Sequence, residues 1–206
     1  MSLFNDTSGP PAECFAVPGV SIWRLSVAQY HEMIRAGILA EDDPVELLDG
    51  CLVQKIIKNP PHCLATGLVR DALEKALPEG WHVKSQDPIT LAASEPEPDV
   101  TVVRGSRRDY ADRHPGPADV ALVVEVADTG LQRDQVLKKA LYAQAAIPVF
   151  WILNLVERRL EVYKEPSGPG EQPDYRTLRN CGPGEEAAVL LEGQEVARLP
   201  VASLLP

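Results

Sequence analysis

The segment that decides the fold runs from Val120 to Tyr163. It reads VALVVEVADTG (120–130), LQRDQVLKKALYAQAAIP (131–148), VFWILN (149–154) and, after three residues, RRLEVY (158–163). The first and third pieces are nearly all apolar, which is typical of central strands covered on both faces. The second piece is long enough for a helix, and RRLEVY alternates like a half-exposed strand. A strand, helix, strand order favours neighbouring parallel strands. We therefore expect an α/β fold with a central mixed β-sheet flanked by helices.

The remaining elements follow from turn and capping signals. Ser26 is a good N-cap for a helix that Gly37 ends, and Asp49–Gly50 is a strong hairpin turn. Pro60 and Pro61 open a second helix. Short strands are expected at WHVKSQ (81–86), ITLAA (89–93) and DVTVV (99–103), and the tail after residue 185 is expected to form a hairpin and a final helical turn.

Length and composition fit one soluble domain. The chain has 206 residues, of which 45% are hydrophobic. We expect a flexible polar leader over residues 1–20 and a single domain over residues 21–206. No apolar run approaches the roughly 20 residues of a membrane helix, and no secretory signal opens the chain. The four cysteines lack zinc-ligand spacing, so reduced thiols and a cytoplasmic location are expected.

The formal net charge of −10 argues against a broad basic surface for nucleic acid. It leaves a nuclease possible, because bound divalent metal would neutralise part of the acidity and positive charge could be local.

Two acidic residues interrupt apolar strand sequences. Asp99 follows Pro98 in EPDVTVV, and Glu125 lies within VALVVEVA. A buried charge costs several kcal/mol unless it is paired or binds a metal. Mg²⁺ takes oxygen ligands and is often held by one or two carboxylates. Asp99 and Glu125 are therefore candidate ligands of Mg²⁺ or Mn²⁺, with the carbonyl of Val126 as a third oxygen, if the two strands are adjacent.

The helix that follows carries Asp134, Lys138 and Tyr142 at a spacing of four residues, so the three share one face. One reading is a local Asp–Lys ion pair with Tyr142 packed on the sheet. The other places the Lys138 ammonium at the metal site, where it would assist the attacking water. Treated as a surface lysine, Lys138 would contribute less than about 1 kcal/mol to stability.

Three of the candidates keep an alternative role. Asp99 could cap the turn after Pro98. Glu46, in VELLDG, is either a third acidic ligand or an exposed edge residue. His62 is either part of the site or a capping or surface histidine at the start of its helix.

The order ELLDG, His62, PDV, VVEV, RDxxxKxxxY and IPxFWI resembles the restriction-endonuclease domain family of the Uma-two type, which belongs to the PD-(D/E)xK nuclease superfamily. The resemblance covers about residues 25–163. It implies a restriction-endonuclease-like core with Asp99 and Glu125 as metal ligands. The superfamily lysine position, two residues after Glu125, is Ala127 here, and the family commonly uses a lysine on the next helix, which Lys138 matches.

Further positions carry over from the same resemblance. Glu46 matches the early acidic ligand, His62 the family histidine, and Asp134 and Tyr142 the helix motif. The expected function is thus a Mg²⁺-dependent endonuclease that hydrolyses DNA phosphodiester bonds. The alternatives are a non-catalytic nuclease-fold module that binds partners or subunits, and a nuclease acting on RNA or in transposition. A homodimer is expected from the symmetry of double-strand cleavage.

Overall fold

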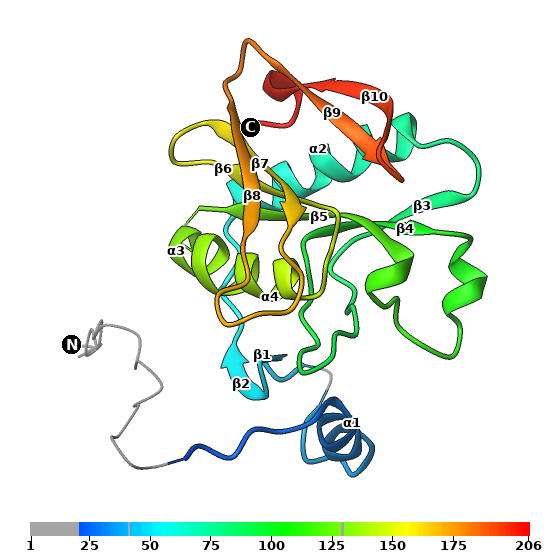
Figure 1. The fold of residues 1–206 in the computed structure, drawn as a ribbon, viewed down its shortest axis with the longest axis vertical. Helices are drawn as coiled ribbons and strands as arrows, with labels where there is room; N and C mark the ends of the chain where they lie inside the picture. The colour runs from blue at the N-terminus through cyan, green and yellow to red at the C-terminus, as the bar shows by residue number, and fades with distance from the viewer. Residues whose placement is uncertain (1–20, 41, 129) are drawn as a thin grey trace, which may run out of the picture.

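The computed structural model describes residues 21–40, 42–128 and 130–206 (Figure 1). The expected leader, residues 1–20, lies outside the described residues. Within them, no helix combines the length and the apolar character needed to cross a bilayer.

A six-stranded mixed sheet forms the centre of the fold, in the order β3-β4-β5-β6-β7-β8. The strands are β3 (Trp81–Lys84), β4 (Val100–Arg104), β5 (Val120–Ala127), β6 (Val149–Asn154), β7 (Arg159–Pro166) and β8 (Tyr175–Cys181). β5 and β6 are parallel, as the strand, helix, strand pattern predicted, and the other neighbours are antiparallel.

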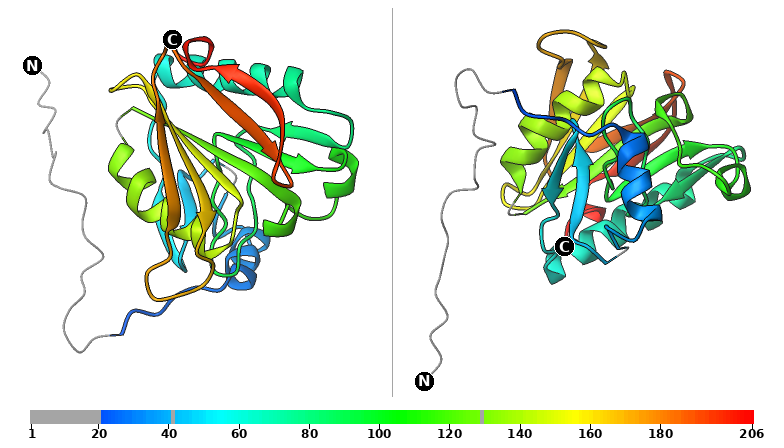
Figure 2. Two further views of the ribbon diagram at one scale, coloured as in Figure 1. Left: turned by 45° about the horizontal axis from the view of Figure 1, so that its top comes forward. Right: turned by 90° about the horizontal axis from the view of Figure 1, so that it is seen from below.

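The two faces of the sheet are covered by different elements (Figure 2). On one face lie α2 (Pro60–Ala76) and the hairpin of β9 (Glu186–Leu191) and β10 (Gln194–Pro200). On the other lies a helix in three parts: α3 (Leu131–Arg133), the π-helical turn η3 (Asp134–Lys138) and α4 (Lys139–Gln144). Alternate residues of β5 serve the two cores, so Val124 packs on the α2 side and Val123 on the α4 side. Glu125, two residues after Val123, faces the α4 side.

The N-terminal elements form a small unit beside the sheet. α1 (Val27–Arg35) begins with a capping box in which Ser26 and Gln29 satisfy each other's backbone N–H groups. β1 (Val45–Leu48) and β2 (Cys51–Gln54) form the predicted hairpin. Its turn residues Asp49 and Gly50 both have positive φ, and a Cβ on Gly50 would collide with Arg24. The remaining short helices are η1 (Arg107–Tyr110), η2 (Pro117–Asp119) and η4 (Val201–Ser203).

The strands differ from the expectation in two places: one expected strand is a loop, and one observed strand was not expected. ITLAA alternates because Ile89 and Leu91 are buried, but the segment is an irregular loop. The backbone N–H of Ile89 binds Pro96 O and that of Leu91 binds Ser94 O, so the chain folds back on itself and joins no sheet. Conversely, β8 is a strand that the sequence did not predict, and its exposed middle residues explain why its apolar pattern is weak.

A buried polar cluster ties the helical face to β6 and β7. The Glu161 carboxylate, 1% exposed, accepts hydrogen bonds from Gln135 Nε2 (3.0 and 2.9 Å), Tyr163 OH (2.7 Å), Asn154 Nδ2 (3.2 Å) and the Arg159 guanidinium (3.0 Å). Burial raises the pKa of Glu161, but these donors outweigh it and the pKa is lowered overall. The cluster therefore favours the ionised carboxylate and anchors the π-helical turn through Gln135.

Glu161→Gln is expected to lower the free energy of unfolding by roughly 2–3 kcal/mol at pH 7, because hydrogen bonds to a charged acceptor are lost. The pKa of Glu161 is lower in the folded protein than its ordinary value of 4.5. Ionised Glu161 therefore stabilises the fold above about pH 4.5, and this stabilisation is lost as the pH falls through the lower, folded-state pKa. The deficit of the variant should therefore shrink below about pH 4. Urea unfolding at a series of pH values measures this deficit, and the control is Glu157→Gln, a substitution at a half-exposed glutamate. A deficit independent of pH would contradict this account of the cluster.

Candidate functional site

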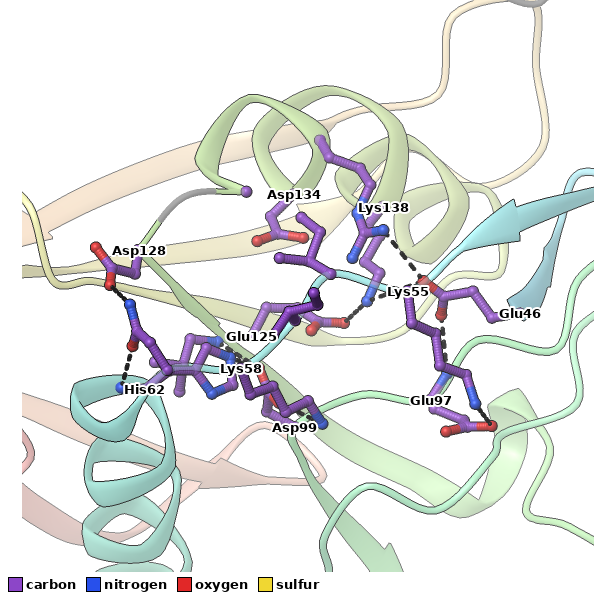
Figure 3. A pocket seen from close by; sticks show the side chains of 16 residues that line it. Glu46, Lys55, Lys58, His62, Glu97, Asp99, Glu125, Asp128, Asp134 and Lys138 are labelled. Carbon is purple, nitrogen blue, oxygen red and sulfur yellow. Dashed lines mark hydrogen bonds and ion pairs between the residues drawn. The ribbon is translucent and has the colours of Figure 1, made fainter. Parts of the chain in front are cut away.

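A pocket of about 60 Å³ opens where the end of β5 meets the π-helical turn, the start of α2 and the segment that leads into β4 (Figure 3). Its side chains are mostly charged. Six carboxylates line it: Glu46, Glu97, Asp99, Glu125, Asp128 and Asp134. The pocket is also lined by five basic side chains: Lys55, Lys58, His62, Arg133 and Lys138.

Asp99 and Glu125 are brought together by the pairing of β4 with β5. Asp99 immediately precedes β4, whose first residue Val100 pairs with Val124 in an antiparallel register. One further step along this register places Asp99 opposite Glu125, and opposite residues share a sheet face. The Asp99 carboxylate continues the ladder, because its Oδ2 accepts the backbone N–H of Val126 at 2.9 Å. The condition stated from the sequence, that the strands carrying the two acids are adjacent, is met by the pairing of β4 with β5.

Asp99 has different partners on its two oxygens. Oδ2, besides Val126 N–H, is 3.1 Å from His62 Nε2, whereas Oδ1 has only Lys58 Nζ at 3.5 Å among the described residues. Burial raises the pKa of Asp99, but the hydrogen bond and charge of His62 outweigh it and the pKa is lowered overall. Asp99 is therefore held as a carboxylate, and no described residue donates a hydrogen bond to its Oδ1.

Glu125 is also bound through one oxygen. Its Oε1 accepts hydrogen bonds from Lys138 Nζ (2.9 Å) and Tyr142 OH (2.7 Å), and no described residue donates to Oε2. Burial raises the pKa of Glu125 more than the Lys138 charge lowers it, and the nearby Asp99 adds to the rise. Without a further cation, Glu125 is thus an acid whose ionised form is costly.

Lys138 is buried, contrary to the expectation of a surface lysine. Its side chain is 3% exposed and lies 2.9 Å from Glu125 Oε1 and 3.8 Å from Glu46 Oε1. Burial lowers the pKa of Lys138, but the surrounding carboxylates outweigh it and raise the pKa overall. Lys138 therefore stays an ammonium at neutral pH and acts as a fixed positive charge, so it is unsuited to act as a base.

Glu46 lies in the same pocket, held by other groups. Oε1 is 3.6 Å from an Arg133 nitrogen, and Oε2 accepts the backbone N–H of Glu97 at 3.2 Å. Its side chain is 2% exposed, which excludes the reading of an exposed edge residue. Across residues 21–40, 42–128 and 130–206, no three His, Cys, Asp or Glu side chains are grouped closely enough to hold a metal ion. Direct coordination by Glu46 together with Asp99 and Glu125 stays a prediction that would require side-chain movement.

Asp134 adds a further buried acid. Its carboxyl is 5% exposed, and burial, followed by the negative charge of Glu125, raises its pKa to about 8. It lies in the π-helical turn, where the N–H of Lys139 binds Asp134 O, five residues back. The wider turn leaves both Asp134 and Lys138 buried at the pocket. The local Asp134–Lys138 ion pair considered from the sequence is not formed within hydrogen-bond distance among the described side chains; Lys138 pairs with Glu125.

Several pocket residues escaped the sequence analysis, among them Lys55, Lys58, Asn59, Glu97 and Arg133. The run KIIKNPP (55–61) links the hairpin to α2, and its two lysines immediately before a helix start were a usable signal. Asn59 caps α2 by accepting the His62 N–H at 3.0 Å and also donates to Asp128. Lys55 Nζ is 2.7 Å from Glu97 Oε1.

Comparison with known proteins identifies the family and a solved structure with the same fold. The model of the Uma2 family, described as "Putative restriction endonuclease", matches residues 27–202. The chain belongs to this family. The fold is also that of a solved structure titled a putative nuclease belonging to DUF820 from Anabaena variabilis, with a TM-score of 0.65, 15% sequence identity, and coverage of 87% of this chain and 97% of that one. No match was found among curated proteins.

The Uma2 fold gathers almost all of the predicted site residues. Glu46, His62, Asp99, Glu125, Val126, Asp134 and Lys138 line one pocket. Tyr142 does not line it but supports it from the core, where its hydroxyl binds Glu125. His62 is 13% exposed and contacts Asp99, which argues against a surface histidine. Their roles in chemistry stay predictions.

The donor set fits a divalent metal of the Mg²⁺ type. Asp99 and Glu125 each have one oxygen without a hydrogen bond from a described residue, and Mg²⁺ is commonly held by one or two carboxylates together with waters and substrate phosphate. Burial raises the pKa of Glu125 despite the nearby Lys138 charge, so a bound cation would favour its ionised form.

Proposed function

We propose that the protein is a Mg²⁺- or Mn²⁺-dependent endonuclease that hydrolyses DNA phosphodiester bonds, with Asp99 and Glu125 as metal ligands. The observation that carries the proposal is the pair of buried carboxylates, Asp99 directly before β4 and Glu125 on the adjacent β5, beside a buried lysine. Each carboxylate has one oxygen to which no described residue donates a hydrogen bond. The family description supports a nuclease, and DNA is the substrate class that restriction endonucleases cut.

The residues of the pocket would have different roles in the reaction. A divalent ion bound there would polarise the phosphoryl group and lower the pKa of a bound water. Asp99 and Glu125 would hold it, with the Val126 carbonyl as the predicted third oxygen. Lys138 is a fixed ammonium whose charge would stabilise the negative charge that develops on the phosphate oxygens in the transition state. Its raised pKa keeps the proton in place throughout.

The supporting residues hold these groups in orientation. Tyr142 and Lys138 fix Glu125 through its Oε1, and His62 with Val126 N–H fixes Asp99 through its Oδ2. Preorganisation of this kind reduces the reorganisation needed during reaction. A homodimer, which would allow cleavage of both strands, and a cytoplasmic location remain part of the proposal.

A second candidate is a non-catalytic nuclease-fold module that binds partners. It is favoured by the net charge of −10 and by Ala127 at the position where the superfamily has its lysine. The presence of Lys138 within 2.9 Å of Glu125 supports the enzyme instead, because the ammonium is supplied from the next helix.

Cleavage assays separate the two candidates. With Mg²⁺ or Mn²⁺, the protein should cut plasmid or linear DNA, and Asp99→Asn and Glu125→Gln should each reduce the rate by about 100-fold or more, as expected for loss of a group that binds the catalytic metal. Asp71→Asn, an exposed carboxylate on α2, is the charge-matched control and should retain the rate. Failure to cut any DNA would refute the proposed substrate, and cleavage of RNA alone would reassign it.

A further inference from the structure

The feature that goes beyond the proposed function is Lys58, a lysine on the loop between β2 and α2. Its Nζ is 3.5 Å from Asp99 Oδ1, to which no described residue donates a hydrogen bond, while the other oxygen is fixed by Val126 N–H and His62. Lys58 is thus the counter-ion on the side of Asp99 where a metal would bind. The contact is an ion pair at the limit of hydrogen-bond range, so it can be exchanged.

Lys58 differs from Lys138 in its access to solvent. Its side chain is 35% exposed, whereas that of Lys138 is 3% exposed. Lys138 is enclosed by Glu125 and Glu46 and has little room to move. A long, partly exposed lysine side chain can move to another anion without unfolding its surroundings.

The loop itself is anchored, so a released Lys58 would stay at the pocket. The backbone N–H of Lys55 binds Pro44 O at 2.7 Å, and Asn59 caps α2. Ile56 packs so closely on Gly130 that an added Cβ there would collide with it. Between these anchors Ile57 is 91% exposed, and the loop contributes both this apolar side chain and the cationic Lys58 to the pocket lining.

We infer that Lys58 is a mobile counter-ion that neutralises Asp99 in the metal-free protein, is displaced when a divalent cation binds, and then contacts a phosphate of the nucleic-acid substrate. The inference rests on the proposed function, because it needs a metal at Asp99 and a phosphodiester substrate. Lys58 would therefore have two opposite effects. It weakens metal binding, because it competes for Asp99, and it strengthens substrate binding, because it contacts a phosphate.

Lys55 provides a matched comparison on the same loop. It also lines the pocket, but its Nζ is 2.7 Å from Glu97 Oε1, and among the described residues it forms no ion pair with Asp99. Replacing Lys55 by methionine removes the same single positive charge from the pocket lining. Only Lys58 should show the paired effects.

The test measures metal and DNA binding separately in the full-length protein. Calorimetric titration with Mn²⁺ should show that Lys58→Met binds the ion about 3- to 10-fold more tightly than wild type, because a competing charge next to the ligand is gone. Binding of a short DNA duplex, with Ca²⁺ in place of Mg²⁺ to prevent cleavage, should weaken by about 10-fold, and the slope of log affinity against log salt should fall by about one ion. Lys58→Arg should restore DNA binding, and Lys55→Met should reproduce neither change.

The outcomes distinguish this inference from the proposed function. If wild type binds no divalent ion, the proposed function fails and this inference fails with it. If wild type binds the ion and Lys58→Met binds it no more tightly, or if Lys55→Met shows the same gain, the inference alone is overturned. Tighter metal binding with unchanged DNA affinity and salt slope would also overturn it, because the substrate contact would be absent.

Discussion

Lys138→Met is expected to lower the free energy of unfolding by about 2–4 kcal/mol at pH 8 and to abolish metal-dependent cleavage. Methionine keeps the apolar stem but leaves Glu125 buried with only Tyr142 as a partner, and a buried charge without its counter-ion typically costs about 3–5 kcal/mol. The loss is partly offset because Glu125, whose pKa is already raised, takes up a proton. At roughly 2–4 °C per kcal/mol, the melting temperature should fall by several degrees or more.

The pH dependence and a double variant provide the controls for Lys138. Because Glu125 protonates more readily as the pH falls, the stability deficit of Lys138→Met should be smaller at pH 5 than at pH 8. Lys138→Met combined with Glu125→Gln removes both charges and should recover most of the stability without recovering cleavage. A melting temperature within a degree or two of wild type for the single variant would show that Lys138 is not the buried partner described here.

The candidate ligands were predictable because an acidic residue in an otherwise apolar strand sequence has few explanations, which singled out Asp99 and Glu125. Their closeness depends on the antiparallel register of β4 and β5, which the sequence analysis left as a condition. The order of β5, helix and β6 predicted the parallel pair and placed Lys138 on the helix that packs back onto the sheet. The fold class was correct for the same reason.

The unpredicted features depend on geometry that sequence periodicity does not carry. The π-helical turn inserts a wider hydrogen-bonded ring between Asp134 and Lys139, and the sequence here has the same residue types as an ordinary helix. The burial of Lys138 could not be read from its residue type, since lysines are mostly exposed. Lys58 approaches Asp99 across 41 positions of sequence (99 minus 58), through the placement of a loop with no regular structure.

Binding of a divalent metal is expected to raise the melting temperature of the protein. An ion that binds only the native state stabilises it by about 2.7 kcal/mol at 100 times its dissociation constant. The expected rise in the melting temperature of wild type is therefore roughly 5–11 °C, using about 2–4 °C per kcal/mol for a chain of this size. Asp99→Asn and Glu125→Gln should lose this rise, because each removes one of the two carboxylates proposed to hold the ion.

The measurement that tests the central claim most directly is thus the melting temperature with and without saturating Mn²⁺, for wild type, Asp99→Asn, Glu125→Gln and the control Asp71→Asn. The proposed site predicts a rise for wild type and for Asp71→Asn, and none for the two pocket variants. A wild type indifferent to Mn²⁺ and Mg²⁺, or a rise that survives in Asp99→Asn and Glu125→Gln, would contradict the claim that these two carboxylates form a metal site.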